Sequence, residues 1–151
     1  MTNQAGYDSP LGQLTLTETD GVITGLAWGG FERVDGSALL DAACAQLSEY
    51  FASARRAFDL PLDFGAGFHE GVRRAMAAIP FGETRTYGDL AKALGAPAQA
   101  IGQACGANPI PILIPCHRIL GANGLGGYSG AGGVETKVAL LRLEGAASLL
   151  I

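Results

Sequence analysis

Histidine and cysteine are scarce in this chain, which has two histidines and three cysteines among its 151 residues. The cysteines, Cys44, Cys105 and Cys116, form no Cys-x-x-Cys pair. Structural zinc usually takes four cysteine or histidine ligands at close spacing, so we expect no metal. An odd number of cysteines without a visible secretory signal predicts free thiols in a reducing compartment, the cytoplasm.

Long apolar runs are also missing, so we expect no membrane span. The segment Met1–Gln4 shows no basic stretch followed by an apolar core, and we therefore expect no signal peptide. Charged residues make up 16% of the chain and apolar residues 48%. This balance excludes a disordered chain and indicates a globular protein with a real core.

Excess positive charge is absent as well, since the net charge is −4. This value is weak evidence against nucleic acid as a partner. Residues 1–64 carry nine acidic residues and three arginines, a balance of −6, whereas residues 65–151 carry five acidic and seven basic residues, a balance of +2. Any contact with DNA is therefore expected in the second part.

The first part reads as a small α/β unit. Leu11–Thr17 and Val22–Trp28 are typical of two strands joined by a turn at Asp20-Gly21. Apolar residues recur at helical spacing over residues 37–55, and Phe58–Leu62 suggests another short strand. We predict an N-terminal α/β domain over residues 1–64.

The second part, residues 65–151, is predicted to be mainly helical and starts after a glycine-rich boundary. One helix face runs over residues 68–79, and two short helices follow over residues 87–94 and 98–107. Thr86 is a suitable N-cap for the first of these, with Asp89 imitating a capping box. The pair has helix-turn-helix form, although an ordinary helical hairpin has the same pattern.

An extended apolar run, Pro111–Pro115, leads into Cys116–Ile119. Seven of the thirteen residues from Gly121 to Gly133 are glycine, which predicts a mobile loop, and a last helix is expected over residues 135–143. The predicted fold class is therefore α/β plus α, with a helix-turn-helix and an active-site loop in the helical C-terminal domain.

Cys116 is the candidate nucleophile. The thiolate is the reactive form of cysteine, and a nearby histidine or cation lowers the thiol pKa. His117 and Arg118 follow Cys116 directly, and Pro115 fixes the backbone before it. Neighbours on an extended chain point to opposite faces, so a buried thiol beside a surface histidine is the alternative.

The segment Asn108–Ile119, with Pro-Cys-His-Arg at residues 115–118, strongly resembles the active-site segment of the O6-alkylguanine-DNA alkyltransferases. Further similarity follows in the order of the chain. Phe81–Thr84 and Thr86–Ala91 resemble the start of that family's helix-turn-helix, and Ala100–Ala104 resembles its recognition helix; Gly127–Gly130 resembles its substrate-pocket loop, and Leu143–Gly145 the segment with its buried glutamate.

This resemblance implies repair of DNA by irreversible transfer of an alkyl group from O6 of guanine to Cys116. His117 would take the thiol proton through a water molecule, and Glu144 would orient His117, as in a nucleophile, base and orienter triad. The family flips the target base out of the duplex. Because the thioether product has no easy hydrolytic exit, one protein would repair one lesion.

The resemblance also implies contacts to the flipped base. Tyr87 would bond the base or crowd its phosphate, Ser129 would donate a hydrogen bond to O6, and Tyr128 would wall the pocket. Asn108 would bridge the recognition helix to the active-site segment, and the backbone near Ile119 would contact the exocyclic amine. The alternatives are a core aromatic for Tyr87, packed or solvated loop residues for Tyr128 and Ser129, and a helix stop for Asn108.

The DNA-contacting residues implied by the resemblance lie at the helix-turn-helix and beside the nucleophile. They are Thr86, Tyr87, Gln99, Ala100, Gly102, Gln103 and Arg118. In the family an arginine at the start of the recognition helix fills the gap left by the flipped base. This chain has Gln99 there, which puts efficient flipping in duplex DNA in doubt.

The partner implied is double-stranded DNA carrying O6-alkylguanine, with O4-alkylthymine as a second candidate lesion; the protein is expected to act as a monomer, without cofactor, metal or membrane. Two rival hypotheses are kept. One is a lesion-binding module without transfer activity, which the retained Cys116 disfavours. The other is a cysteine hydrolase that uses Cys116 and His117.

Overall fold

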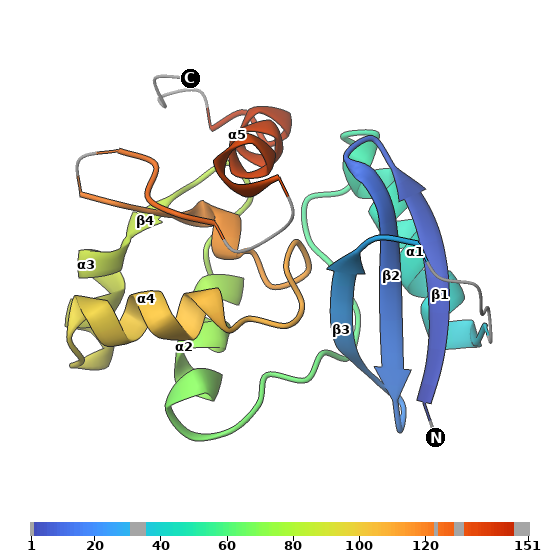
Figure 1. Cartoon of the computed structure of the whole chain (residues 1–151), viewed down its shortest axis with the longest axis horizontal. Coiled ribbons are helices and arrows are strands. Elements are labelled where there is room, and N and C mark those ends of the chain that lie inside the picture. Colours follow the sequence, from blue (N-terminus) through green and yellow to red (C-terminus); the bar gives the residue numbers. More distant parts are fainter. Residues whose placement is uncertain (1, 31–35, 123, 129–131, 147–151) are drawn as a thin grey trace. The chain divides into compact units, whose positions relative to one another are not determined.

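The structure is a computed structural model of the chain, and its description covers all residues except 1, 31–35, 123, 129–131 and 147–151 (Figure 1). The chain forms two compact units, Met1–Asp63 and Phe64–Ile151. None of the helices among the described residues is long and apolar enough to cross a bilayer.

The first unit contains a three-stranded antiparallel sheet in the order β1-β2-β3 (Figure 1). Its strands are β1 (Thr2–Ser9), β2 (Gly12–Thr19) and β3 (Val22–Trp28). The sequence predicts β2 and β3 but not β1, a polar edge strand in which only Ala5 is buried. Every residue of β1 pairs with β2, from Thr2 opposite Thr19 to Ser9 opposite Gly12. Its extended conformation therefore depends on pairing, which a local pattern does not reveal.

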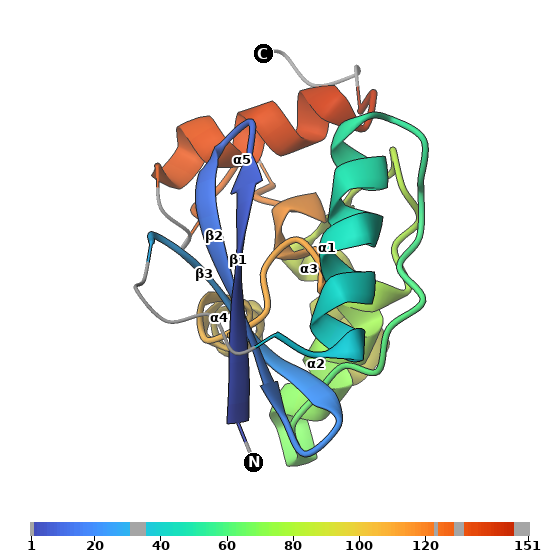
Figure 2. The same ribbon diagram turned by 90° about the vertical axis from the view of Figure 1, so that its right-hand side faces the viewer.

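One helix, α1 (Ala38–Phe51), packs against this sheet, as Figure 2 shows. Leu14 and Leu16 point to the buried face of β2 with the two-residue period of a strand. The helix starts at the N-cap Ser37, whose Oγ accepts a hydrogen bond from the Leu40 amide (3.1 Å) and donates one to Glu18 Oε1 (2.5 Å). This pair of bonds joins the start of α1 to β2.

The strand predicted for Phe58–Leu62 is wrong. Leu62 makes a single parallel bridge to Ile23, with hydrogen bonds from the Ile23 amide to Pro61 O (2.8 Å) and from the Asp63 amide to Ile23 O (2.9 Å). Pro61 has no amide hydrogen to donate, so a longer ladder cannot form around it.

The second unit is helical, as predicted. Three helices pack on one another: α2 (Gly67–Ala77), α3 (Tyr87–Leu94) and α4 (Ala98–Gly106) (Figure 1). A 3-10 turn, η1 (Cys116–Arg118), contacts the last helix, α5 (Gly133–Leu143). Strand β4 (Arg85–Thr86) pairs in parallel with β5 (Ile119–Leu120). This pairing brings the start of α3 beside the end of η1, although the two are far apart in the sequence.

The predicted cap of α3 is confirmed. Thr86 Oγ1 accepts a hydrogen bond from the Asp89 amide (3.0 Å), and Asp89 Oδ2 accepts one from the Thr86 amide (2.9 Å). The helix ends at Gly95, whose φ of 64° is in the left-handed region that favours glycine. The boundaries of α3 are thus determined by local side-chain chemistry.

The segment Pro111–Pro115, just before the nucleophile, was predicted to be extended, and this prediction is wrong. Its backbone turns, with hydrogen bonds from the Leu113 amide to Pro111 O (2.8 Å) and from the Ile114 amide to Ile110 O (2.9 Å). Ile112 has a φ of 71°, a strained value for a β-branched residue. The side chains of Ile110, Ile112 and Ile114 are all buried, so the segment folds into the core.

Candidate active site

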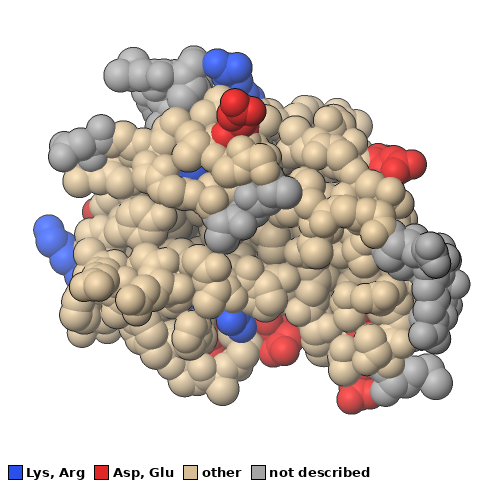
Figure 3. Space-filling view, viewed as in Figure 1, with Lys and Arg blue, Asp and Glu red and all other residues tan. Residues whose placement is uncertain are grey.

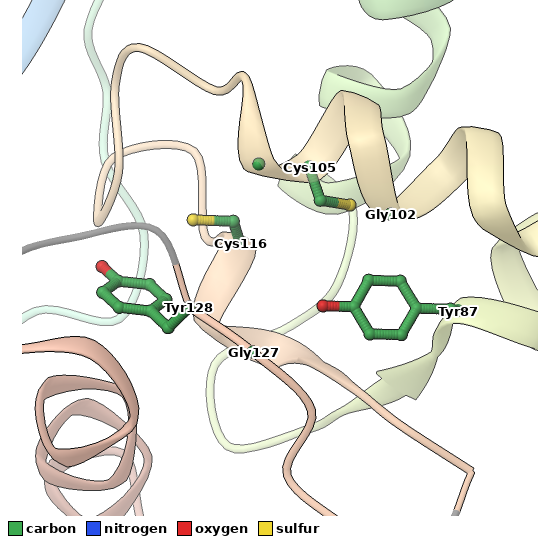
Figure 4. Close-up of a pocket in the computed structure, with 7 residues that line it drawn as sticks. Tyr87, Gly102, Cys105, Cys116, Gly127 and Tyr128 are labelled. Atoms are coloured by element: carbon green, nitrogen blue, oxygen red, sulfur yellow. The ribbon is translucent and has the colours of Figure 1, made fainter.

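A cavity of about 320 Å³ opens within the second unit beside Cys116, and Figure 4 shows most of its walls. Its volume falls in the range of small-molecule sites. Three helical elements and the loop before α5 contribute the lining residues: Tyr87 of α3, Gly102, Cys105 and Gly106 of α4, Cys116 of η1, and Gly127 and Tyr128 of the loop.

Cys116 lies at the start of η1 and is 7% exposed. Burial raises the pKa of its thiol, while a hydrogen bond from Asn108 and the charge of Lys137 oppose this rise. The backbone here is a 3-10 turn and not a strand, so the expectation that neighbouring side chains alternate between two faces does not apply. Because its raised pKa keeps the thiol protonated, Cys116 needs a proton acceptor to become a nucleophile.

His117 and Glu144 form a completely buried pair, with His117 Nε2 2.7 Å from Glu144 Oε2. Burial lowers the pKa of His117 and outweighs the opposing effect of Glu144. Burial raises the pKa of Glu144, but hydrogen bonds from His117 and Arg118 prevail and bring it to about 2. At neutral pH we therefore assign a neutral imidazole that donates from Nε2 to a carboxylate.

The other ring nitrogen of His117 has the opposite role in this tautomer. Nδ1 becomes a hydrogen-bond acceptor, and it is buried without a partner among the residues that the structure describes. A buried acceptor in this state is unusual in a folded protein. His117 thus has the free basic nitrogen that a proton acceptor next to Cys116 requires.

Arg118 points inward, which does not fit the DNA contact expected for it. Its Nε and Nη2 donate to the two carboxylate oxygens of Glu144 (2.8 and 2.9 Å), and Nη1 donates to Ile79 O (2.6 Å). Only 6% of the residue is exposed. This bidentate pair compensates the buried charge of Glu144 and fixes its orientation, so we assign Arg118 a positioning role.

Gly82 shows how closely the chain packs around this charge cluster. It has a φ of 83°, and a Cβ there would lie 3.1 Å from Glu144 O. The backbone conformation favours glycine at this position, and the close approach leaves little room for a side chain.

Asn108 holds the turned segment in place. Its side-chain amide donates to Ile114 O (2.9 Å), and its side-chain oxygen accepts from the Ile110 amide (3.1 Å). The residue is buried. It therefore does more than end a helix, because it fixes the backbone that leads into Cys116.

Lys137 is a site residue that the sequence patterns do not indicate. This lysine of α5 is completely buried, and its Nζ donates to Leu125 O (2.5 Å) and Gly127 O (3.0 Å). Burial lowers its pKa to about 8. Lys137 thus ties a cavity-lining loop to α5. One signal was available, because Lys137 lies seven residues before Glu144 and so on the same face of the last helix.

The residues expected to contact a base are placed in three ways. Tyr87 and Tyr128 line the cavity, and burial raises the pKa of both phenols, so they stay protonated donors. Ile119 is completely buried in β5 and does not line the cavity. Ser129 lies outside the described residues.

The residues expected to contact DNA from α4 form an uncharged surface. Gln99 and Gln103 are exposed, Ala100 is half-buried, and Gly102 lines the cavity, whereas Thr86 uses its hydroxyl as the cap of α3. Figure 3, in the view of Figure 1, shows few charged atoms over this helix. Two of the seven basic residues of the second unit, Arg118 and Lys137, are buried and contribute little to the surface.

The described part of the chain holds no group of three or more histidine, cysteine, aspartate or glutamate side chains that could bind a metal ion. The three cysteines are all free thiols.

Two family profiles match the chain and together span nearly all of it. Residues 67–146 match the DNA-binding domain of 6-O-methylguanine DNA methyltransferase, and residues 4–64 match its ribonuclease-like domain. The two matches fall on the helical unit and the sheet unit respectively.

Curated relatives and solved structures agree with these matches. The chain is 43% identical to the methylated-DNA–protein-cysteine methyltransferase of Mycobacterium tuberculosis (95% of this chain, 93% of that one) and 40% identical to the constitutive one of Bacillus subtilis (91% and 92%). A crystal structure of O6-methylguanine methyltransferase from M. tuberculosis superposes with a TM-score of 0.84 at 41% identity (97% and 94%). The structure of an M. tuberculosis relative in complex with DNA gives a TM-score of 0.82 at 42% identity (96% and 94%).

Proposed function

Because the chain belongs to the 6-O-methylguanine DNA methyltransferase family, we propose that it repairs DNA by moving an alkyl group from O6 of guanine to its own Cys116. The protein is consumed in the reaction. One observation carries the assignment: Cys116 lines a cavity and is followed directly by the buried His117–Glu144 pair.

Thiol activation is the first step. His117 Nδ1 accepts the proton of Cys116 through a water molecule, and the imidazolium that forms is stabilised by the Glu144 carboxylate 2.7 Å from Nε2. Arg118 keeps Glu144 ionised and oriented. Transfer of the proton from a neutral thiol to a neutral imidazole creates two opposite charges close together, which attract strongly in a buried site.

Alkyl transfer is the second step. The Cys116 thiolate attacks the alkyl carbon, an S–C bond forms, and the C–O6 bond breaks with its electron pair leaving on guanine. Guanine then takes up a proton. Tyr87 remains a neutral phenol in the cavity and can donate a hydrogen bond to the base as charge develops on it. The thioether that remains on Cys116 is not hydrolysed, so turnover stops.

The rival hypotheses fit these observations less well. A lesion-binding module has no need for a buried proton acceptor with an unpartnered nitrogen beside a cysteine, and the curated relatives are named as methyltransferases. A cysteine hydrolase forms a thioester that water can cleave, and none of the described residues that line the cavity indicates an acyl substrate.

DNA is the partner that this function requires. In support, the DNA-binding family profile covers the helical unit, and a relative has been crystallised with DNA. We propose that the protein acts as a monomer on O6-alkylguanine, in a reducing compartment such as the cytoplasm, where Cys116 stays a thiol.

The test is the number of guanines released per protein. With excess O6-methylguanine DNA, release should stop at one equivalent of active protein, and Cys116→Ser should release none. Continued release would contradict a consumed acceptor. Tight binding of the lesion without release would instead support the lesion-binding module.

A further inference from the structure

Two glycines of α4 are not explained by the helix itself. Gly102 lies in the middle of α4 and Gly106 is its last residue, four positions later on the same face. Glycine weakens a helix relative to alanine because it has more freedom to lose on folding. Neither residue has a positive φ, in contrast to Gly95 at 64°. The backbone conformation therefore does not require glycine at either position.

Packing does not require these glycines either. A Cβ built on Gly102 or Gly106 meets no atom within 4 Å, whereas one on Gly126 would lie 3.1 Å from Gly121 N. An alanine would thus fit the protein at both sites. What the two positions share is the cavity beside Cys116, which they line together with Cys105. Because both glycines line the cavity and no protein atom lies within 4 Å of either Cβ position, we infer that a methyl group there would narrow the cavity.

We propose that Gly102 and Gly106 are substrate-positioning residues that keep the α4 side of the cavity open for the purine ring of the alkylated base. The inference rests on the proposed function, because it takes the cavity to be the base pocket. Their helix-weakening effect is then explained by substrate access. The α4 side of the cavity at Gly102 and Gly106, here called the wall, limits how close the base can lie to the backbone of this helix.

The purine, and not the transferred alkyl group, is assigned to this wall from the direction of the nucleophile. The alkyl carbon must lie within about 3–3.5 Å of Cys116 Sγ to react. Figure 4 shows this sulfur pointing away from Gly102 and Cys105, toward the side of Tyr128. The part of the substrate that borders α4 is therefore the part that is not transferred. Changes at the wall should affect all alkyl groups alike.

The experiment compares Gly102→Ala and Gly106→Ala with a matched control, Gly71→Ala. Gly71 is a half-buried glycine within α2; its Cβ would also meet nothing within 4 Å, and it does not line the cavity. Single-turnover rates are measured with O6-methylguanine DNA, O6-benzylguanine DNA and free O6-benzylguanine. Tm shifts caused by free O6-benzylguanine are measured in a Cys116→Ser background, where no transfer occurs.

We expect Gly71→Ala and Gly102→Ala to raise Tm by about 1–4 °C. Rates should fall by roughly tenfold to a hundredfold with all three substrates in both α4 variants, as expected for a misfit of one methyl group, and stay unchanged in Gly71→Ala. The ligand-induced Tm shift should be lost in the α4 variants only.

Three results would overturn the inference. Unchanged rates in the α4 variants would mean that the wall borders no substrate. A loss of rate confined to the benzyl substrates would place the alkyl group at the wall. A loss of rate confined to the DNA substrates would place the DNA backbone there. Failure of the proposed function is a separate result, because the unsubstituted protein would then form no Cys116 adduct. In that case the Tm shifts of the Cys116→Ser series still decide whether the glycines admit the base.

Discussion

The imidazole of His117 lies 2.7 Å from the carboxylate of Glu144, and both side chains are completely buried. The two residues are 27 positions apart in the sequence. Their contact leaves Nδ1 of His117 as an unpartnered acceptor among the described residues, next in sequence to the candidate nucleophile. The proposed activation of Cys116 depends on this relationship.

Replacement of His117 or Glu144 should therefore slow transfer without removing DNA binding. His117→Ala and Glu144→Gln should each lower the single-turnover rate by roughly the 10²–10⁴-fold typical of lost acid–base help. Glu144→Gln keeps the shape but accepts less strongly from Nε2. The control is Glu70→Gln, which alters an exposed ion pair with Arg74. A normal rate in His117→Ala would show that the proton takes another route.

The same pair should make the protein sensitive to acid. The pKa of Glu144 is lowered to about 2 in the folded state, so its stabilising contribution is present above the ordinary value of 4.5 and is lost as pH falls from 4.5 toward 2. A shift of this size corresponds to roughly 3 kcal/mol of unfolding free energy. The lowered pKa of His117 acts in the same direction, beginning below 6.5.

Denaturant unfolding of the wild type and Glu144→Gln between pH 7 and pH 3 measures this effect. Glu144→Gln should be less stable at pH 7 and should lose less of its stability as pH falls. Parallel pH profiles for the two proteins would contradict the assignment of an ionised, hydrogen-bonded Glu144.

Lys137 should act by positioning the loop before α5, which contributes Gly127 and Tyr128 to the cavity. Lys137→Met keeps much of the side-chain volume but removes the hydrogen bonds to Leu125 O and Gly127 O. We expect weaker binding of free O6-benzylguanine and transfer slowed by roughly tenfold or more, since small displacements at a reacting centre are costly. A variant that binds and reacts normally would exclude this role.

The lowered pKa of Lys137 gives a second readout of the same substitution. Its folded-state pKa is about 8 against an ordinary 10.5, so the unfolded chain binds more protons between these values. Lys137 should therefore make the protein more stable as pH rises from 8 to 10.5, and Lys137→Met should lack this contribution. Chemical unfolding across that pH window makes the comparison.

Gln99 should limit repair of duplex DNA. Its exposed, uncharged side chain lies on α4, at the position where the resemblance implies an arginine that fills the gap left by the flipped base. An arginine could stack on the neighbouring bases and contact a phosphate. Gln99→Arg should accelerate duplex repair, affect free O6-benzylguanine less, and steepen the salt dependence of DNA binding by about 0.9 in log–log slope.

Rates on duplex, single-stranded and free-base substrates decide this point. The difference in rate between duplex and single-stranded DNA should be smaller in Gln99→Arg than in the wild type, because the arginine would offset part of the cost of unstacking the base. If the duplex rate stays the same or falls, Gln99 does not occupy the intercalating position.

Local patterns predicted much of the helical unit. The Thr86–Asp89 capping box and the stop at Gly95 are short-range signals, and the structure confirms both. Strand β1 was missed because its polar residues become a strand only by pairing with β2. The turn around Ile112 was missed because burial of the apolar side chains overrides a conformation that a β-branched residue rarely adopts.

The site shows the same division between short-range and long-range information. The Pro-Cys-His-Arg motif identifies Cys116, but the sequence does not show that Arg118 turns inward to Glu144 or that Lys137 reaches Gly127 O. The Arg118 contact depends on how α5 packs on η1, and the Lys137 contact depends on how the preceding loop lies against α5; no local pattern encodes either.

The central claim is most directly tested by the mass of the intact protein after incubation with O6-methylguanine DNA, followed by peptide mapping. One methyl group should add about 14 Da, the peptide that contains Cys116 should carry it, and Cys116→Ser should gain nothing, as covalent nucleophilic catalysis requires. Cys105 is an internal control, since it lines the same cavity and burial raises the pKa of its thiol to about 12. A methyl group on Cys105 or Cys44, or an unchanged mass in the presence of repaired DNA, would contradict the account.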